Sequence, residues 1–251
     1  MATGIGGEVA WWCPSLDSTQ SGSTLTDLAG SNNVTLTNMA LSGSSSNWVS
    51  DTESGGSVAI DLDGTNDYGD AGTSATFSPS PMSISLRLKM NASPAAFDGI
   101  FGRSSGSGWN DGFGLYWTSS TGIRFWLNSY SVNYASGSVA DATTWNHIVG
   151  TWTTTQQPKI YANGTLGTST GGGPTSQSGT SVQLSIGRLF SDTYNINGRL
   201  DDIRIFNRVI TSGEISSLGS QRGYQPSSGF VPSLDSKMSS GGFQFMSGGL
   251  G

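Results

Sequence analysis

Cysteine and long apolar runs are both scarce in this chain of 251 residues. Cys13 is the only cysteine, so no intrachain disulfide can form. Gly, Ser, Thr or Asn interrupts every apolar run before it reaches the roughly 18 residues that a membrane-spanning helix needs. We therefore expect no membrane partner. The residues before Val9 contain neither a basic segment nor a continuous apolar segment, so we expect no secretory signal.

Charged residues are also few, at 11% of the chain, and only three of them are glutamates. Long exposed helices rely on Glu, Lys and Ala, so this composition favours a chain that is mostly β. The 11 Lys and Arg residues are outnumbered by 17 Asp and Glu residues, which gives a formal charge of -6. The cations are scattered along the chain, so we expect no nucleic-acid partner.

Residues for nucleophilic catalysis are scarce too. His147 is the only histidine, and its apolar surroundings in the sequence favour a hydrogen-bonded core histidine over a member of a catalytic triad. Cys13 has no basic neighbour that would activate a thiolate. Phosphate-binding loops and the usual Cys and His spacings of metal sites are also missing from the sequence.

Alternating apolar and polar residues are what the chain does have. The period of two over Met82–Met90 predicts a half-buried strand. In residues 145–152, both the odd-numbered and the even-numbered positions include apolar side chains. This predicts a central strand covered on both faces. Asn163-Gly164 predicts a hairpin, and residues 211–214 fit a capping box that opens a short helix. Many short strands at such spacing indicate a sandwich or a barrel.

Three stretches, in this order, resemble one known family: residues 62–68 (LDGTNDY), 145–152 (WNHIVGTW) and 198–208 (GRLDDIRIFNR). They are similar to the laminin-G-like jelly-roll domains of the concanavalin A-like lectin and glucanase superfamily. The resemblance implies an all-β fold, a two-sheet antiparallel jelly-roll sandwich, with ligands on the concave face or the loop rim. We expect this domain at residues 8–219, after a lead at residues 1–7 and before a Gly/Ser-rich extended tail at residues 220–251.

Glucanases of this superfamily carry the pattern Glu-x-Asp-x-x-Glu on one strand, because retaining hydrolysis needs two carboxylates about 5 Å apart. The present chain lacks that pattern. Its three glutamates, Glu8, Glu53 and Glu214, are far apart in sequence, and the capping box explains Glu214. Asp61 and Asp63 form an Asp-x-Asp pair, but next to a turn. We therefore predict that the protein is not an enzyme.

A structural calcium ion is a candidate cofactor. The turn that contains Asp63, Gly64 and Asp67 concentrates oxygen donors around a flexible glycine, as calcium requires. Parity places Asp201 on the buried face with Ile203, where a carboxylate must be paired or bound to metal. The resemblance implies that such an early turn and late strand share the ion. The alternative is a set of Asx-turns, with Asp201 accepting hydrogen bonds from the turn.

Glycan binding needs exposed aromatic faces beside amides and carboxylates. Parity places Trp126 opposite its apolar neighbours, so we expect its side chain to be exposed. The candidate ligand-binding residues are Trp126, Asn128, Tyr130, Trp109 and Asp111. The alternative is ordinary packing of Trp and Tyr on a sheet face.

Two functions from different classes remain open. The first is a non-catalytic phage virion surface component, such as a capsid decoration or fibre protein, whose tail with Phe243 and Phe245 docks on other virion subunits or on a second copy of the chain. The absence of catalytic residues and of an export signal favours this reading and a virion location. The second is a calcium-dependent carbohydrate-binding or adhesion module of a secreted or cell-surface protein.

Overall fold

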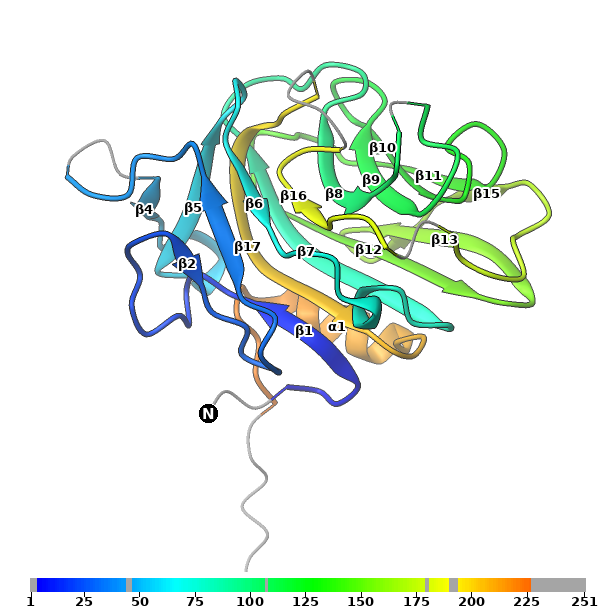
Figure 1. Ribbon diagram of the computed structural model, residues 1–251, viewed down its shortest axis with the longest axis horizontal. Coiled ribbons are helices and arrows are strands. Elements are labelled where there is room, and N and C mark those ends of the chain that lie inside the picture. Colours follow the sequence, from blue (N-terminus) through cyan, green and yellow to red (C-terminus); the bar gives the residue numbers. More distant parts are fainter. Residues whose placement is uncertain (1–3, 44–46, 107, 179–180, 190–193, 227–251) are drawn as a thin grey trace, which may run out of the picture.

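The computed structural model describes residues 4–43, 47–106, 108–178, 181–189 and 194–226. Two antiparallel sheets pack face to face, and one short helix, α1 (Ser212–Ser220), lies against the first of them (Figure 1). Two short 3-10 turns, η1 (Glu53–Gly55) and η2 (Ala75–Phe77), connect strands. Among these described residues, no helix has the length and apolar character to cross a membrane.

The first sheet has eight strands: β1 (Glu8–Trp12), β4 (Trp48–Ser50), β5 (Val58–Asp63), β7 (Met82–Met90), β12 (Asn146–Thr153), β13 (Gln156–Ala162), β14 (Thr165–Leu166) and β17 (Asn197–Phe206). Their order is β14-β13-β12-β7-β17-β5-β4. The first half of β17 pairs with β5 and its second half pairs with β1.

The second sheet has nine strands: β2 (Thr24–Leu25), β3 (Val34–Thr37), β6 (Tyr68–Asp70), β8 (Gly99–Arg103), β9 (Phe113–Trp117), β10 (Gly122–Leu127), β11 (Tyr134–Ser138), β15 (Thr168–Thr170) and β16 (Ser185–Ile186). Their order is β15-β11-β10-β9-β8-β16-β6-β3-β2. The predicted all-β, two-sheet antiparallel jelly-roll sandwich with one short helix is confirmed.

The main core lies between the sheets and contains the alternate residues of β7, from Met82 to Met90. Most of the other face of β7 is also buried, because residues 208–210 and α1 cover it: Ser83 Oγ donates to Arg208 O at 2.8 Å, and Arg87 donates to Leu218 O at 2.9 Å. The prediction of a half-buried strand was therefore wrong about that face. Strand β12 is covered on both faces, as predicted.

Helix α1 begins as predicted, with a capping box in which the Thr211 side chain accepts from the Glu214 amide and the Glu214 carboxylate accepts from the Thr211 amide. Its apolar side chains, Ile215 and Leu218, form a second small core with Val149 of β12 on the outer face of the first sheet. The helix therefore covers part of the outer face of the first sheet.

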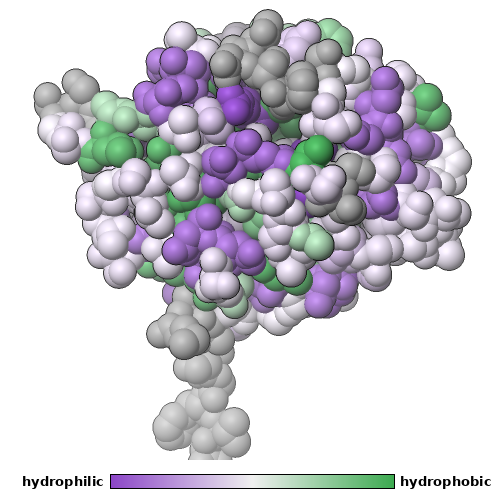
Figure 2. Space-filling view, viewed as in Figure 1, coloured by the Kyte–Doolittle hydropathy of each residue, from purple (hydrophilic) through white to green (hydrophobic). Residues whose placement is uncertain are grey.

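The outer surface carries few large apolar side chains. In Figure 2, hydrophobic patches on the face shown are small and separated by hydrophilic or neutral surface. Among the described residues, the exposed large hydrophobic side chains are Phe97, Val132, Leu166 and Val209. Phe97 differs from the others because its ring contacts those of Trp109 and Tyr116.

Candidate functional site

Aromatic side chains gather on the outer face of the second sheet, away from the main core. Tyr116 of β9 and Trp126 of β10 point outward from the sheet, and their alternate neighbours point into the core. Loops bring further rings over them. We call the whole set the aromatic cluster, which consists of Phe97, Trp109, Tyr116, Trp126, Tyr130 and Tyr194.

Trp109 is the centre of the aromatic cluster. Its ring stacks on Trp126, with centroids 6.3 Å apart and an interplanar angle of 4°. The edges of Tyr116, Tyr130 and Tyr194 meet it at centroid distances of 5.2, 5.6 and 5.3 Å. Both stacked and edge-to-face geometries are favourable for aromatic pairs, so these contacts stabilise the position of the Trp109 ring.

Two members of the cluster have unusual backbone conformations. Phe97 has φ +75° and Trp109 has φ +43°, in the left-handed region that bulky residues rarely adopt. Hydrogen bonds hold both: Phe97 N donates to Trp117 O at 2.7 Å, and Trp109 N donates to Gly106 O at 3.0 Å. Strain of this kind concentrates at binding sites, where it fixes a side chain in a required place.

The cluster borders a hollow of about 420 Å³, which we call the aromatic hollow. Its lining residues are Phe97, Gly108, Trp109, Asn110, Tyr130, Ser131 and Tyr194, none of which carries a charge at neutral pH. Phe97 is 41% exposed and stacks on Tyr116 at 5.9 Å. Within the described part of the chain, the buried Trp109 Nε1 has no hydrogen-bond acceptor.

Arg124 lies beside the aromatic cluster, and its guanidinium already contacts two tyrosine side chains. Its Nη1 donates to Tyr116 Oη at 2.9 Å, and its guanidinium carbon lies 3.8 Å from the centre of the Tyr134 ring. Burial raises the pKa of Tyr116 despite the opposing charge of Arg124, so its hydroxyl stays protonated at neutral pH. Arg124 is not among the residues that line the aromatic hollow.

The expected exposure of Trp126 was wrong. Its side chain has no exposed surface, although it points away from the main core as its parity predicts. The loop that carries Trp109 covers the Trp126 side chain. The alternation of apolar and polar residues along one strand cannot predict that a distant loop covers its outer face. Of the other predicted residues, Trp109 and Tyr130 line the aromatic hollow.

Asn128 and Asp111 support loops near the aromatic hollow without lining it. Asn128 donates to Ser176 O at 2.7 Å and accepts from Ser178 N at 3.0 Å. Asp111 accepts from Ser104 Oγ at 2.7 Å and from Ser105 N at 2.8 Å. Burial raises the pKa of Asp111, but the hydrogen bonds from Ser105 and Ser104 outweigh it and lower the pKa overall.

Sequence reasoning missed two aromatic lining residues, Phe97 and Tyr194. Each is an isolated aromatic residue in a loop, and Tyr194 also lies far from Trp109 in sequence. An aromatic residue among the small residues before Asp98 was the available signal for Phe97. For Tyr194, whose backbone carbonyl accepts from Gly99 N at 3.0 Å, the sequence offers no local signal.

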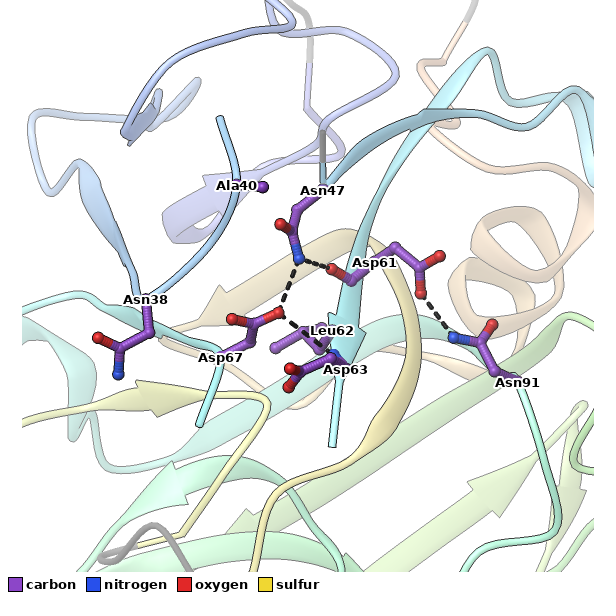
Figure 3. Close-up of a pocket in the computed structure, with 8 residues that line it drawn as sticks. All are labelled: Asn38, Ala40, Asn47, Asp61, Leu62, Asp63, Asp67 and Asn91. Carbon is purple, nitrogen blue, oxygen red and sulfur yellow. Dashed lines mark hydrogen bonds between the residues drawn. The ribbon is translucent and has the colours of Figure 1, made fainter. Parts of the chain in front are cut away.

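The predicted calcium turn lines a separate polar hollow of about 430 Å³ (Figure 3). Asp63 Oδ1 accepts from Thr65 N at 2.7 Å, which is the Asx-turn of the alternative reading. Asp67 Oδ2 accepts from Asn47 Nδ2 at 2.7 Å and from Asp63 N at 3.2 Å. Gly64 has φ +76°, which the tight turn requires. Burial raises the pKa of Asp67 although the bond from Asn47 opposes it.

Asp201 does not join that turn, and this prediction was wrong. Asp202 has φ +49° and forms a bulge in β17, so the register shifts between Asp201 and Arg204. Leu200 and Ile203 then face the core while Asp201 faces the outside of the sheet, where it is completely buried. A bulge inverts the parity of the residues that follow it. Among the described residues, no three His, Cys, Asp or Glu side chains form a metal-binding group.

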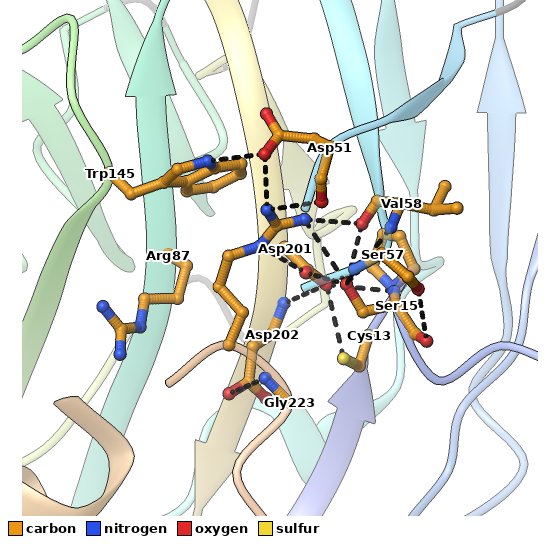
Figure 4. Close-up of polar contacts among 12 residues, drawn as sticks. Cys13, Ser15, Asp51, Ser57, Val58, Arg87, Trp145, Asp201, Asp202 and Gly223 are labelled. Atoms are coloured by element: carbon orange, nitrogen blue, oxygen red, sulfur yellow. Dashed lines mark hydrogen bonds and ion pairs between the residues drawn. The ribbon is translucent and has the colours of Figure 1, made fainter. Parts of the chain in front are cut away.

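Asp201 instead belongs to a buried charge network (Figure 4). Arg222 Nε donates to Asp201 Oδ2 at 2.8 Å, and Arg222 Nη1 donates to Asp51 Oδ1 at 2.8 Å. Ser15 Oγ donates to the same carboxylate of Asp201 at 2.5 Å. The Trp145 ring lies 4.0 Å from the guanidinium of Arg222. The packed domain thus extends past the predicted boundary at residue 219, at least to Arg222.

Cys13 and His147 are both buried. Burial, followed by the charges of Asp201 and Asp202, raises the pKa of the Cys13 thiol, which disfavours the nucleophilic thiolate. His147 is 2% exposed, and its Nε2 lies 2.8 Å from Ser85 Oγ. The burial and the hydrogen bond predicted for His147 are confirmed, but the side chain lies on the outer face of the first sheet and not in the main core.

A family model described as the concanavalin A-like lectin/glucanases superfamily, Laminin_G_3, matches residues 63–216. Among curated protein sequences, none matches this chain. Several solved structures share its fold at low sequence identity.

One is domain 4 of AbnA, an extracellular GH43 arabinanase from Geobacillus stearothermophilus, in complex with arabinotriose. It has a TM-score of 0.63 and 17% identity, over 84% of this chain and 98% of that domain. Another is the CBM40 of the Ruminococcus gnavus IT-sialidase bound to α2,3-sialyllactose, with a TM-score of 0.52 and 16% identity, over 64% and 96%. The Trypanosoma rangeli sialidase with the inhibitor DANA has a TM-score of 0.62 and 15% identity, over 86% of this chain. The match covers only 33% of that sialidase.

Proposed function

The chain belongs to the concanavalin A-like lectin/glucanase superfamily, and from this premise we propose that it is a non-catalytic module that binds neutral glycans in the aromatic hollow. One observation carries the proposal: Phe97, Trp109, Tyr130 and Tyr194 line a hollow in which no described lining residue is charged, and the Phe97 side chain is exposed there.

The chemistry of the hollow suits a sugar. Apolar faces of sugar rings pack on aromatic rings, while their hydroxyls require donors and acceptors nearby. Phe97 offers an exposed ring, and Asn110 and Ser131 offer an amide and a hydroxyl. A volume of about 420 Å³ falls within the roughly 300–1,000 Å³ that is usual for ligand pockets.

None of the described lining residues is charged, which favours neutral sugars over acidic ones. The structures of similar fold include one domain bound to arabinotriose, which is neutral, and one bound to sialyllactose, which is anionic. A carboxylate would need a cation in the hollow. Arg124 is instead engaged by Tyr116 Oη and by the Tyr134 ring.

The experiment is calorimetric titration with neutral oligosaccharides, including arabinotriose, and with sialyllactose as the acidic comparison. We expect binding of at least one neutral oligosaccharide and its loss in Phe97→Ala. Leu166→Ala is the matched control, because Leu166 is 54% exposed on the edge strand β14 of the other sheet. Failure of every neutral glycan to bind, or equal binding by Phe97→Ala, would contradict the proposal.

We also propose that the chain is a phage virion surface component. Its support comes from the sequence: the tail after Tyr224 is rich in Gly and Ser yet contains Phe243 and Phe245, which suit docking on a neighbouring subunit. Residues 227–251 lie outside the described part of the chain. Deletion of residues 227–251 is expected to prevent incorporation into particles while the domain still folds. Normal incorporation of the deleted form would contradict the proposal that the tail docks on a neighbouring subunit. Recovery of the native protein from the cell envelope would instead favour an adhesion module.

A further inference from the structure

A second hollow, of about 480 Å³, lies on the outer face of the first sheet, between α1 and the turn that joins β13 to β14. We call it the helix hollow. The aromatic hollow lies on the outer face of the other sheet, so the two hollows share no lining residue. His147 of β12 and Gly219 of α1 both line the helix hollow.

His147 places an unsatisfied polar atom at the helix hollow. Its side chain is 2% exposed and its Nε2 is 2.8 Å from Ser85 Oγ, but its Nδ1 has no partner among the described residues. Buried polar atoms in proteins are nearly always hydrogen-bonded, and an exception calls for an explanation. Burial, followed by the charges of Arg87 and Arg204, lowers the pKa of His147 to about 3, so the ring is neutral.

Gly219 keeps the space beside Nδ1 open. A Cβ at this position would lie 3.1 Å from His147 Nδ1, and its nearest neighbours would all be atoms of that ring. The φ angle of Gly219 lies outside the left-handed region, so its backbone conformation does not require glycine. Glycine at this position therefore leaves space beside the imidazole, because any other side chain would cover Nδ1.

The rest of the lining supplies free hydroxyls. Within the described part of the chain, the side chains of Tyr161, Thr165, Ser212 and Ser216 donate and accept no hydrogen bonds. All four line the helix hollow, and none of its described lining residues carries a charge. Hydroxyls both donate and accept, so a lining of this kind matches a ligand that is itself rich in hydroxyls. An anion would find no cation in the lining.

We propose that the helix hollow is a second binding site, for one neutral sugar ring or a polyol of similar size, and that His147 Nδ1 is its buried anchor. A ligand hydroxyl donates a hydrogen bond to Nδ1 through the space beside Gly219. The hydroxyls of α1 and β14 form hydrogen bonds with the other side of the ligand. The Tyr161 ring gives the ligand an apolar surface to pack against. This site is independent of the proposed function of the aromatic hollow.

His147 is also the means of testing the proposal, because it is the only histidine of the chain. Its imidazole ¹⁵N resonances therefore report on the helix hollow alone. The full chain is titrated separately with D-glucose, D-galactose, L-arabinose and glycerol. We expect at least one of these probes to shift the Nδ1 resonance in a saturable manner. No shift with any of the four probes would overturn the proposal.

Substitutions then separate the site from its surroundings. Gly219→Ala is expected to weaken the binding of the active probe at least about tenfold. Gly213→Ala is the matched control in the same helix, since a Cβ there meets nothing closer than Thr211 Oγ1 at 3.9 Å. If Gly219→Ala does not fold, Ser216→Ala replaces it, with the same expected direction. Equal affinity in the site variant and the control would overturn the proposal, and Phe97→Ala is expected to leave the His147 shift intact.

Discussion

Arg222 and Asp201 form an ion pair at 2.8 Å in which neither side chain has any exposed surface. Arg222 follows the last helix, and Asp201 lies in the middle of β17. The same guanidinium also donates to Val58 O at 2.7 Å and to the backbone carbonyl of Asp51 at 3.0 Å. One side chain thus joins the C-terminal segment to β5, to β17 and to the loop before η1.

Replacing Arg222 is expected to destabilise the fold severely. Arg222→Leu leaves Asp201 buried without its cation, which costs about 3–5 kcal/mol for pairs of this kind. Urea denaturation measures the change in the free energy of unfolding. Lys89→Ala is the control: it breaks an exposed pair with Glu53 and should cost less than about 1 kcal/mol. A chain ending at residue 226 should fold, whereas one ending at residue 219 should not, and the opposite result would refute the role of Arg222.

The pH dependence of stability should carry the signature of His147. Its pKa is about 3 in the folded state, below the usual value of 6.5, so the unfolded state binds a proton more readily. Stability is therefore fully present above about pH 6.5 and falls as the pH is lowered toward 3, with a slope of up to roughly 1.4 kcal/mol per pH unit. His147→Gln should flatten the slope between pH 6.5 and 5 in urea denaturation series. An unchanged slope would mean that His147 does not titrate as its burial implies.

The strained backbone at Phe97 predicts an unusual order of stabilities. Because φ is +75°, glycine should be more stable than alanine there by about 1 kcal/mol, the reverse of the usual order in regular structure. Thermal unfolding of Phe97→Gly and Phe97→Ala measures the difference. If the Phe97→Ala variant is more stable than the Phe97→Gly variant, residue 97 does not have a left-handed backbone conformation.

The helix cap offers a local test with a close control. Thr211→Ala removes the hydroxyl that accepts from the Glu214 amide at 3.2 Å and should cost about 1 kcal/mol. Thr211→Ser keeps the hydroxyl and should cost much less. Chemical denaturation compares the two variants, and equal losses would show that the cap contributes little.

Calcium remains a prediction, and the structure narrows the residues that would hold the ion. Asp63 Oδ2 and Asp67 Oδ1 accept no hydrogen bonds within the described residues, and both side chains line the polar hollow. Millimolar calcium is expected to raise the Tm of the wild type and to leave Asp67→Asn unchanged. Asp201→Asn should lower the Tm but preserve the increase with calcium. A Tm that does not respond to calcium would contradict the prediction.

The fold was largely predictable because its signals are local. Alternation in Met82–Met90 and the capping box at Thr211 each depend on a few neighbouring residues, and both elements are present. The burial of the outer face of β7 was not predictable in this way. It depends on α1 and Arg222, which are more than 120 residues away in sequence.

The candidate site was less predictable, for two physical reasons. The bulge at Asp202 changes the facing of Asp201, and alternation cannot reveal a bulge whose residue is not glycine. The cover over Trp126 comes from a loop, and loops are positioned by the whole fold. Trp109 and Tyr130 were predicted because they are aromatic residues in or near loops, beside polar groups that could bind sugar hydroxyls.

The attachment of residues 222–224 also has a mechanical consequence. Gly223 N donates to Asp202 Oδ2 at 3.0 Å, and Tyr224 O accepts from Arg204 of β17. A pulling force applied at the C-terminal end of the described chain therefore reaches these bonds and the Arg222 ion pair before it reaches α1. The segment acts as a clamp that transfers tension directly to β17, the strand that pairs with β1, β5 and β7.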